Sequence, residues 1–190
     1  MIYLLVGLAM WWGAHLMKRV LPELRRDMDK TIGIGPSKGI VSVLILASVA
    51  LMVIGYRAAD FTPLYSPIPG IGYLNNLLMF PALYLMGVSP SGGRLSTKIR
   101  HPMLWGMFTW TIAHLLVNGD LASVVMFGGL GSWTLVQMRL INQHEGPWEC
   151  PKAGAPLQDY KLALTTLFLF VVITGIHWLF DRNPFLGTYG

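Results

Sequence analysis

The sequence predicts an all-α protein, a polytopic integral membrane helical bundle of about six transmembrane helices with both termini on the periplasmic side. Three observations lead to this fold class. Hydrophobic residues make up 54% of the 190 residues and charged residues only 12%, whereas a soluble domain is about 25% charged. The mean hydropathy is +0.54. The apolar residues form long runs, and the connections between these runs carry the Lys and Arg. We expect one domain that covers residues 1–190.

The first apolar run covers residues 1–17 and ends directly before Lys18 and Arg19. A signal peptide carries its positive charge ahead of the apolar run and a small-residue cleavage site behind it, so the reversed order predicts a retained first helix. Residues 18–38 are polar and are expected to form a loop. The next apolar run, residues 39–56, predicts the second helix.

A third and shorter helix is predicted at residues 74–88, after a loop at 57–72 that is rich in proline and aromatic residues. Pro81 lies inside this helix and predicts a kink, because proline lacks the N–H and its ring clashes with the preceding turn. Residues 89–101 are rich in turn-forming residues and are expected to form the next loop.

The fourth helix is predicted at residues 102–117, with a proline in its first turn, where the missing N–H costs nothing. Residues 118–120 read Asn-Gly-Asp and predict a tight turn. Asp120 is expected to cap the fifth helix, at residues 121–140. That helix also holds two small residues four positions apart, which predict close packing against a neighbouring helix: Gly128 and Ser132.

The sixth helix is predicted at residues 162–180, before a short tail at 181–190. Lys and Arg then fall on alternate sides of the spans. The connections after helices one, three and five hold six, three and three, whereas those after helices two and four and the tail hold one, none and one. Because Lys and Arg stay on the cytoplasmic side, we expect periplasmic termini in a multi-pass protein of a bacterial inner membrane. This distribution explains the +5 net charge without a nucleic-acid partner.

The five histidines are the main candidates for chemistry. An ionisable group at membrane depth is a functional-site hypothesis by default. Four of the five histidines lie in or at the edge of a predicted span, whereas His144 lies within a loop. Two membrane histidines that face each other across a bundle can be axial ligands of a haem. The chain has no HxxxH, HExxH or CxxC zinc motif and no CxxCH for covalently attached haem. The alternative is a set of hydrogen-bonded residues at helix ends. The four candidates are His15, His101, His114 and His177.

Two smaller groups of residues accompany the histidines. Trp110 precedes His114 by one helical turn, and flat aromatic side chains of this kind suit a porphyrin, although such stripes also occur in plain helix packing. Arg100 and His101 open the fourth helix at the predicted cytoplasmic side. Arg forks onto carboxylates and phosphates, so this pair either holds an anionic ligand or anchors the helix at the interface.

Several segments resemble the NnrU family of bacterial membrane proteins. The strongest are Arg-His-Pro-Met-Leu followed by Gly at 100–106, and W-x-x-A-H-L-L-x-N-G-D-L-A-S at 110–123. His15 before a basic stretch, Gly-Tyr-Arg-Ala-Ala at 55–59, and a His followed by an aromatic residue in the last helix agree with it. The resemblance covers nearly the whole chain, and it implies a link to denitrification and nitric oxide metabolism.

The family is in turn similar to the zeta-carotene isomerase of plants and cyanobacteria, a membrane haem b enzyme with two histidine axial ligands that isomerises a cis double bond. Carried over by position, this similarity implies metal ligation by His15 and His114, with His101 as a further important histidine. It implies haem b as cofactor. From the residues themselves, we expect Arg100 and His101 close by at the cytoplasmic face and Trp110 on the His114 side of the haem. An apolar polyene or nitric oxide would be the ligand, and the lipid bilayer the surroundings.

Two alternatives to this pair of ligands stay open. On the predicted topology His15 and His114 differ in depth by about 10 Å, at 1.5 Å per residue. His15 with His101, or His114 with His177, would be better matched in depth.

Two other functions also stay open. Arg-His-Pro-x-x-x-Gly resembles the motif of isoprenylcysteine carboxyl methyltransferases, which bind S-adenosylmethionine, but Leu104 replaces their Tyr. The third function is a non-enzymatic assembly or regulatory factor for nitrogen-oxide reductases.

Overall fold

The computed structural model describes residues 1–180 and 184–185, so the tail predicted at 181–190 lies outside the described residues apart from those two. In the described part the chain folds into seven α-helices and one short 3-10 helix, which confirms the all-α prediction. The elements are α1 (Ile2–Val20), α2 (Pro22–Ile32), α3 (Ile34–Arg57), α4 (Ile71–Ser91), η1 (Arg94–Thr97), α5 (Pro102–Val117), α6 (Leu121–Glu145) and α7 (Pro156–Leu179).

Four of these helices, α3, α4, α6 and α7, are long and apolar enough to cross a membrane. The protein is therefore a multi-pass membrane protein by the length and composition of its helices. Helix α5 is apolar but has 16 residues, about 24 Å at 1.5 Å per residue. Helix α1 carries Lys18 and Arg19 in its last turn, which lowers its hydropathy. Six spans and periplasmic termini remain predictions.

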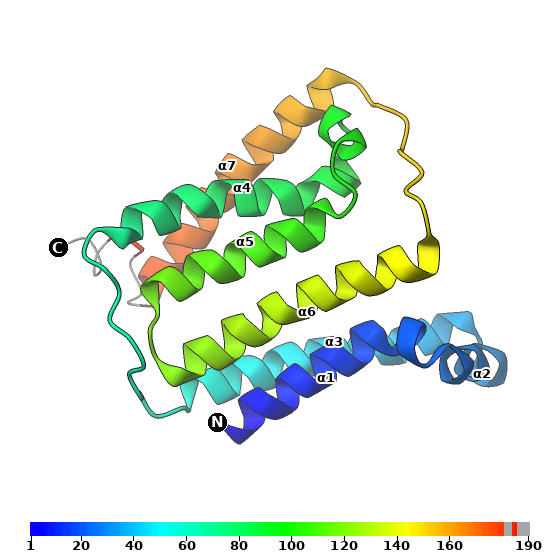
Figure 1. Ribbon diagram of the computed structural model, residues 1–190, viewed down its shortest axis with the longest axis horizontal. Helices are drawn as coiled ribbons and strands as arrows, with labels where there is room; N and C mark the ends of the chain where they lie inside the picture. Colours follow the sequence, from blue (N-terminus) through cyan, green and yellow to red (C-terminus); the bar gives the residue numbers. More distant parts are fainter. Residues whose placement is uncertain (181–183, 186–190) are drawn as a thin grey trace.

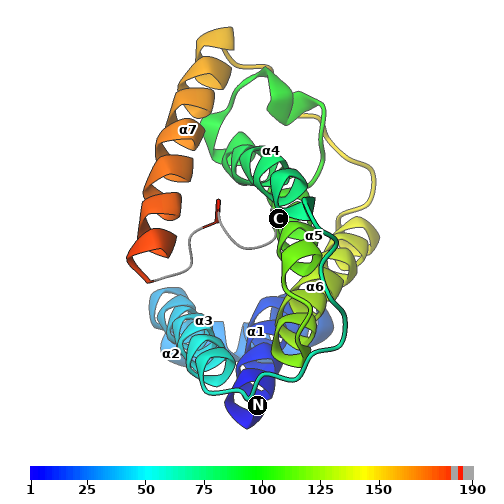
Figure 2. The same ribbon diagram turned by 90° about the vertical axis from the view of Figure 1, so that its left-hand side faces the viewer.

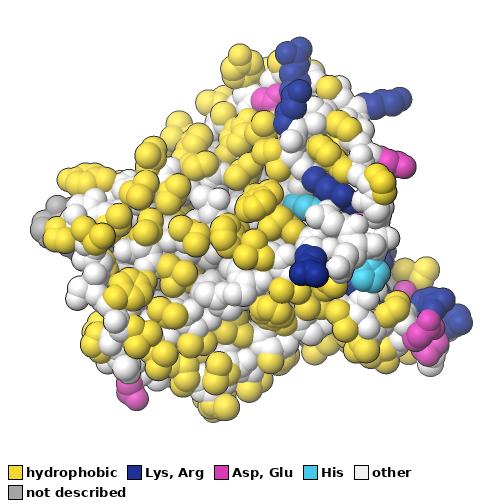
Figure 3. All heavy atoms as spheres, viewed as in Figure 1, with side chains coloured by type: hydrophobic (Ala, Val, Ile, Leu, Met, Phe, Trp, Pro, Cys, Tyr) yellow, Lys and Arg dark blue, Asp and Glu magenta, His cyan; other side chains and the backbone are white. Residues whose placement is uncertain are grey.

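The six long helices run alternately in opposite directions, so their connections gather at two ends of the molecule (Figure 1). One end carries α2, η1 and the α6–α7 connection, and we call it the basic end. The opposite end carries the N-terminus, the α3–α4 connection and the α5–α6 turn. Lys and Arg side chains gather at the basic end on the face shown in Figure 3. This is the segregation expected from their distribution along the sequence.

Seen from one end, the helices follow one another around an open ring in the order α7, α4, α5, α6, α1 and α3 (Figure 2). The closest pairs are α4 with α5 and α1 with α3, and α5 and α1 both pack against α6. Helix α7 packs against α4 and η1. Helix α6 therefore lies between the two pairs, in contact with both.

Glycines allow the two closest pairs to approach. A Cβ at Gly55 of α3 would collide with the backbone of Leu4 in α1, and one at Gly106 of α5 would lie 2.6 Å from the carbonyl oxygen of Ala82 in α4. Small residues at such positions let helix backbones pack directly in a membrane. These two contacts hold α1 against α3 and α5 against α4.

The prediction that Gly128 and Ser132 pack closely against a neighbour is wrong. A Cβ at Gly128 would meet nothing within 4 Å, and Ser132 is exposed. Gly129 faces α1 and Gly131 faces α5 instead. Each step along a helix turns the side chain by about 100°, so adjacent glycines of α6 lie on different faces.

Several helix boundaries also differ from the prediction. Helix α2 occupies part of the loop predicted at 18–38, with Pro22 as its first residue and an Arg25–Asp29 ion pair at i,i+4 spacing. Helices α4, α6 and α7 extend beyond the apolar runs at 74–88, 121–140 and 162–180. The predictions ended each helix where the apolar run ended, but a helix continues into the interface when polar residues there favour it.

The fourth predicted helix is correct at both ends, since α5 covers Pro102–Val117. The cap predicted for the following helix is also confirmed. The Asp120 carboxylate accepts a hydrogen bond from the backbone N–H of Ser123 at 3.0 Å, which satisfies one of the free donors at the start of α6.

Candidate functional site

His15 belongs to a cluster of aromatic rings formed by α1 and α6. Its Nδ1 donates to the carbonyl of Trp11, one turn earlier, at 2.9 Å. The imidazole centroid is 4.1 Å from the Trp11 ring and 4.9 Å from the Trp133 ring of α6. Because a carbonyl only accepts, the neutral imidazole carries its proton on Nδ1 and presents a lone pair at Nε2. This is the state in which histidine ligates a metal.

His114 repeats the arrangement on α5. Its Nδ1 donates to the carbonyl of Trp110 at 2.9 Å, and its ring lies 4.7 Å from both Trp110 and Phe127 of α6. Phe127 is only 4% exposed. The prediction placed Trp110 beside His114 from helical spacing, and the structure shows the two rings in contact.

His144 and His177 also donate from Nδ1 to a carbonyl one turn earlier, at 2.9 and 2.8 Å. The hydrogen bond from Nδ1 to a carbonyl therefore does not by itself distinguish His15 and His114 from His144 and His177. What distinguishes His15 and His114 among the described histidines is the additional contact with a Trp of their own helix and an aromatic ring of α6.

The two aromatic clusters border one apolar core. Trp11 and Trp110 both pack against it, although they lie on helices that are far apart in sequence. The core is formed by five buried side chains from α1, α3 and α6: Leu4, Leu8, Met52, Ala122 and Leu130.

The two histidines contact different turns of α6. Phe127 and Trp133 are six residues apart, about 9 Å along the helix axis. This agrees with the difference in depth of about 10 Å estimated from the sequence. His15 and His114 thus share α6 as a common wall, but at different heights.

The alternative pairs can be placed on the same scale. His101 Nε2 donates to Asn142 Oδ1 at 2.8 Å, and Asn142 lies nine residues beyond Trp133 on α6, or about 14 Å. The structure therefore does not bring His101 to the level of His15. His177 is near enough to His114 for the two imidazoles to interact electrostatically.

Buried polar atoms without partners lie in the same contact between α1 and α6. Within the described residues, the indole N–H groups of Trp11 and Trp133 and the side-chain oxygen of Gln137 are buried and make no hydrogen bond. Such an atom costs about 1–3 kcal/mol when it is left unpaired. The surroundings of His15 therefore contain two unused donors and one unused acceptor, which a ligand with polar groups can satisfy.

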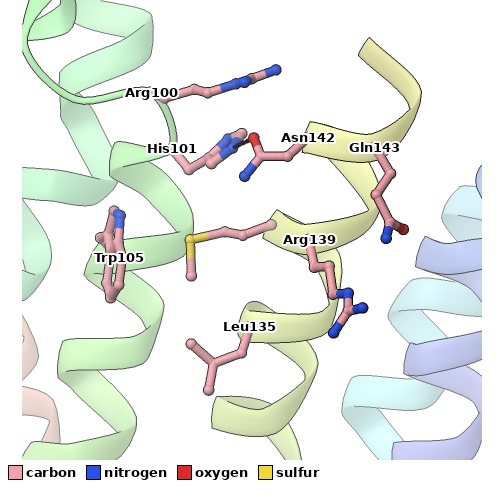
Figure 4. A pocket seen from close by; sticks show the side chains of 8 residues that line it. Arg100, His101, Trp105, Leu135, Arg139, Asn142 and Gln143 are labelled. Atoms are coloured by element: carbon pink, nitrogen blue, oxygen red, sulfur yellow. Dashed lines mark hydrogen bonds between the residues drawn. The ribbon is translucent and has the colours of Figure 1, made fainter. Parts of the chain in front are cut away.

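Arg100 and His101 lie apart from this region, at the basic end. Arg100 Nη2 donates to the carbonyl of Gly146 at 2.7 Å. Asn142, the partner of His101, is fifteen residues beyond Phe127 on α6, or about 22 Å along its axis. Arg100 and His101 share a pocket with Arg139 (Figure 4). The structure does not bring Arg100 or His101 to His114.

The aromatic partners on α6, Phe127 and Trp133, were not among the residues predicted for the site. Gln137 follows Trp133 by one turn and was also missed. The available signal was the Trp-x-x-x-Gln spacing on one face of an apolar helix. That spacing places two polar-tipped side chains at membrane depth.

The fold and these residues define a class of protein, a multi-pass helical membrane protein with histidines in aromatic surroundings. The family model described as NnrU protein matches residues 3–184. The chain therefore belongs to the NnrU family over nearly its whole length. No curated protein and no solved structure matches the chain.

The donor set around the two histidines fits a haem. Both imidazoles present Nε2, both stand beside flat aromatic rings, and the indole N–H groups near His15 can donate to carboxylates such as haem propionates. No group of three or more His, Cys, Asp or Glu that could hold a bare metal ion occurs among the described residues.

Proposed function

We propose that this NnrU protein binds haem b within the bilayer, where His15 and His114 would ligate the iron and Trp110 would lie beside the group. The supporting observation is the shared environment of these two histidines, in which Nδ1 donates to a carbonyl and the ring contacts both a Trp of its own helix and an aromatic residue of α6. Haem supplies an iron centre that changes oxidation state and binds small or unsaturated ligands.

The chain's own residues would orient and shield this group. The carbonyls of Trp11 and Trp110 fix the tautomer of each imidazole, which is the usual role of a second partner on a ligating histidine. The aromatic side chains of α6 limit the access of water. The free indole N–H groups of Trp11 and Trp133 would bind its carboxylates.

We also propose a role in nitrogen-oxide metabolism, because the chain belongs to the NnrU family. The haem would supply an iron centre for nitric oxide, or control by oxidation state over cis–trans isomerisation of an apolar polyene. The apolar side chains exposed on α3 and α7 would face the lipid, in which an apolar polyene would dissolve.

Absorption spectra of the detergent-purified protein, oxidised and dithionite-reduced, test this proposal. The wild type should show a Soret band that sharpens on reduction, and His15→Ala and His114→Ala should each lose or shift it. His144→Ala is the matched control, because His144 makes the same carbonyl bond without a described aromatic contact. A colourless wild type, expressed with ample haem, would contradict haem binding.

The alternative ligand pairs require two further variants. If the Soret band survives in His15→Ala but is lost in His114→Ala and His177→Ala, the ligands are His114 and His177. Loss in His15→Ala and His101→Ala, with His114→Ala unchanged, would move the haem toward the basic end.

A further inference from the structure

A second candidate site lies at the basic end, between the start of α5 and the last turns of α6 (Figure 4). It is a pocket of about 570 Å³. Its lining combines three basic or imidazole side chains, two amides and three apolar side chains: Arg100, Arg139, His101, Asn142, Gln143, Trp105, Leu135 and Met138.

The charge of this pocket is not compensated. Its lining contains no carboxylate, and Arg139 has no ion-pair partner among the residues that the structure describes. The single acidic residue of α6, Glu145, forms its ion pair with Arg19 of α1 at 2.9 Å. Two guanidinium groups thus face a space without an anion, and guanidinium is the side chain best suited to bind a phosphate.

Arg100 is held in place for this role. One of its nitrogens donates to the carbonyl of Gly146 at 2.7 Å, which leaves its other N–H groups available. His101 is likewise held by Asn142 at 2.8 Å. Figure 4 shows Arg100 and His101 at the start of α5, with Asn142 and Arg139 opposite on α6.

The other half of the pocket is apolar and open to the surroundings. Trp105 of α5 is 43% exposed and Leu135 of α6 is 45% exposed. Trp105 lies one turn after the start of α5, and Leu135 lies several turns before the end of α6, so both are nearer the middle of the bilayer than Arg100 and Asn142. Trp is characteristic of the membrane interface, where its amphipathic ring lies at the level of the headgroups. A small hydrophilic anion would leave this apolar surface unused.

We propose that this pocket binds an anionic phospholipid. Arg139 contacts its phosphate, Arg100 adds positive charge at the end of the pocket next to Gly146, and one acyl chain lies along Trp105 and Leu135. Basic pockets between transmembrane helices on the cytoplasmic side are known places for anionic headgroups. Arg139 lies six residues beyond Trp133, which His15 contacts, or about 9 Å along α6, so the phosphate end of this site is separate from the proposed haem.

The experiment is a titration of the full-length detergent-purified protein with short-chain phosphatidylglycerol, followed by native mass spectrometry. Phosphatidylcholine with the same chains tests the need for net negative charge, and inorganic phosphate is added as a competitor. Arg139→Gln is the test variant. Arg94→Gln is the matched control, because Arg94 is an exposed arginine at the same end and outside the pocket.

We expect the wild type to bind phosphatidylglycerol more tightly than phosphatidylcholine. Arg139→Gln should weaken phosphatidylglycerol binding about tenfold or more, which is the usual loss on removing a charge-assisted hydrogen bond, and Arg94→Gln should not. Leu135→Ala should also weaken it, through the lost chain contact. Far-UV circular dichroism checks the fold of each variant.

Three results would overturn the proposal. Equal binding of the two lipids would show that negative charge is not recognised, and equal losses in Arg94→Gln and Arg139→Gln would indicate only the diffuse positive field of this end. Displacement by an equal concentration of inorganic phosphate, with Leu135→Ala unchanged, would indicate an ion site. The absorption spectrum of Arg139→Gln keeps this outcome separate from haem binding, since a haem-loaded protein should keep its Soret band.

Discussion

Tyr65 joins the loop after α3 to the turn between α5 and α6. Its hydroxyl donates to the carbonyls of Leu115 and, at 2.9 Å, Asn118, and its backbone N–H binds the carbonyl of Gly119 at 3.1 Å. Burial, and then the nearby Asp120 carboxylate, raise the pKa of Tyr65 above its ordinary value near 10. The neutral phenol is therefore the form that the folded protein favours.

This raised pKa predicts a loss of stability in alkali. The folded state holds the proton more tightly than the unfolded state, so the contribution of Tyr65 is complete below about pH 10 and falls as the pH rises through the folded pKa. Tyr65→Phe should cost about 1 kcal/mol at pH 7 through the lost hydrogen bonds. Denaturant unfolding at pH 7 and near pH 10.5 measures the free energy of unfolding of wild type and variant. The difference between these two free energies should be smaller at the higher pH. A constant difference would contradict this assignment.

The histidine sites show how far single residues could be predicted. His15 and His114 each contact the Trp four positions earlier, and helical spacing alone gives that neighbour. Phe127 and Trp133 were not predicted, because the rotation of α6 relative to α1 and α5 depends on packing between helices that are distant in sequence. The difference in depth between His15 and His114 was predicted because it follows from position along each helix.

The pairing of α4 with α5 depends on one glycine, and this predicts a clear contrast between two substitutions. Gly106→Val should push α5 away from the carbonyl of Ala82, which a Cβ would approach to 2.6 Å, and should cost about 1–3 kcal/mol, as overpacking does. Gly128→Val in α6 meets nothing within 4 Å and should be nearly neutral. Thermal unfolding in detergent measures both variants, and equal losses would show that the close contact does not matter.

The helices themselves were predicted unevenly, for physical reasons. Helix α5 was correct because Pro102 and the Asn-Gly-Asp turn mark its ends chemically. Helix α2 was missed because its residues are polar, and only their spacing, as in Arg25 and Asp29, indicates a helix. Pro81 lies within α4, since the apolar residues on both sides continue the helix past it.

At the scale of the whole molecule, the single cysteine tests the orientation in the membrane. Cys150 is exposed in the α6–α7 connection at the basic end. If that end is cytoplasmic, a thiol reagent that cannot cross membranes should label inverted vesicles and leave intact cells unlabelled. The reverse result would invert the predicted topology.

A matched variant completes the test of orientation. Asp60→Cys combined with Cys150→Ser moves the thiol to the exposed α3–α4 connection at the opposite end. This variant should be labelled in intact cells. The prediction places three spans, α4, α5 and α6, between the two connections. Labelling of both thiols from the same side would mean that the number of spans between them is even, and would contradict it.

The length of α5 has a consequence for the bilayer around it. A helix of 16 residues reaches about 24 Å, whereas the hydrocarbon layer is about 30 Å thick. If α5 spans the bilayer, as the sequence predicts, this is a hydrophobic mismatch, and a membrane adapts to a short helix by thinning beside it. Headgroups and water then descend toward Pro102 at one end and Asn118 at the other. A spanning α5 would thus bring the aqueous boundary close to His101, directly before its first residue, and to His114 in its last turn, and protons and electrons would have the least hydrocarbon to cross along this side of the protein.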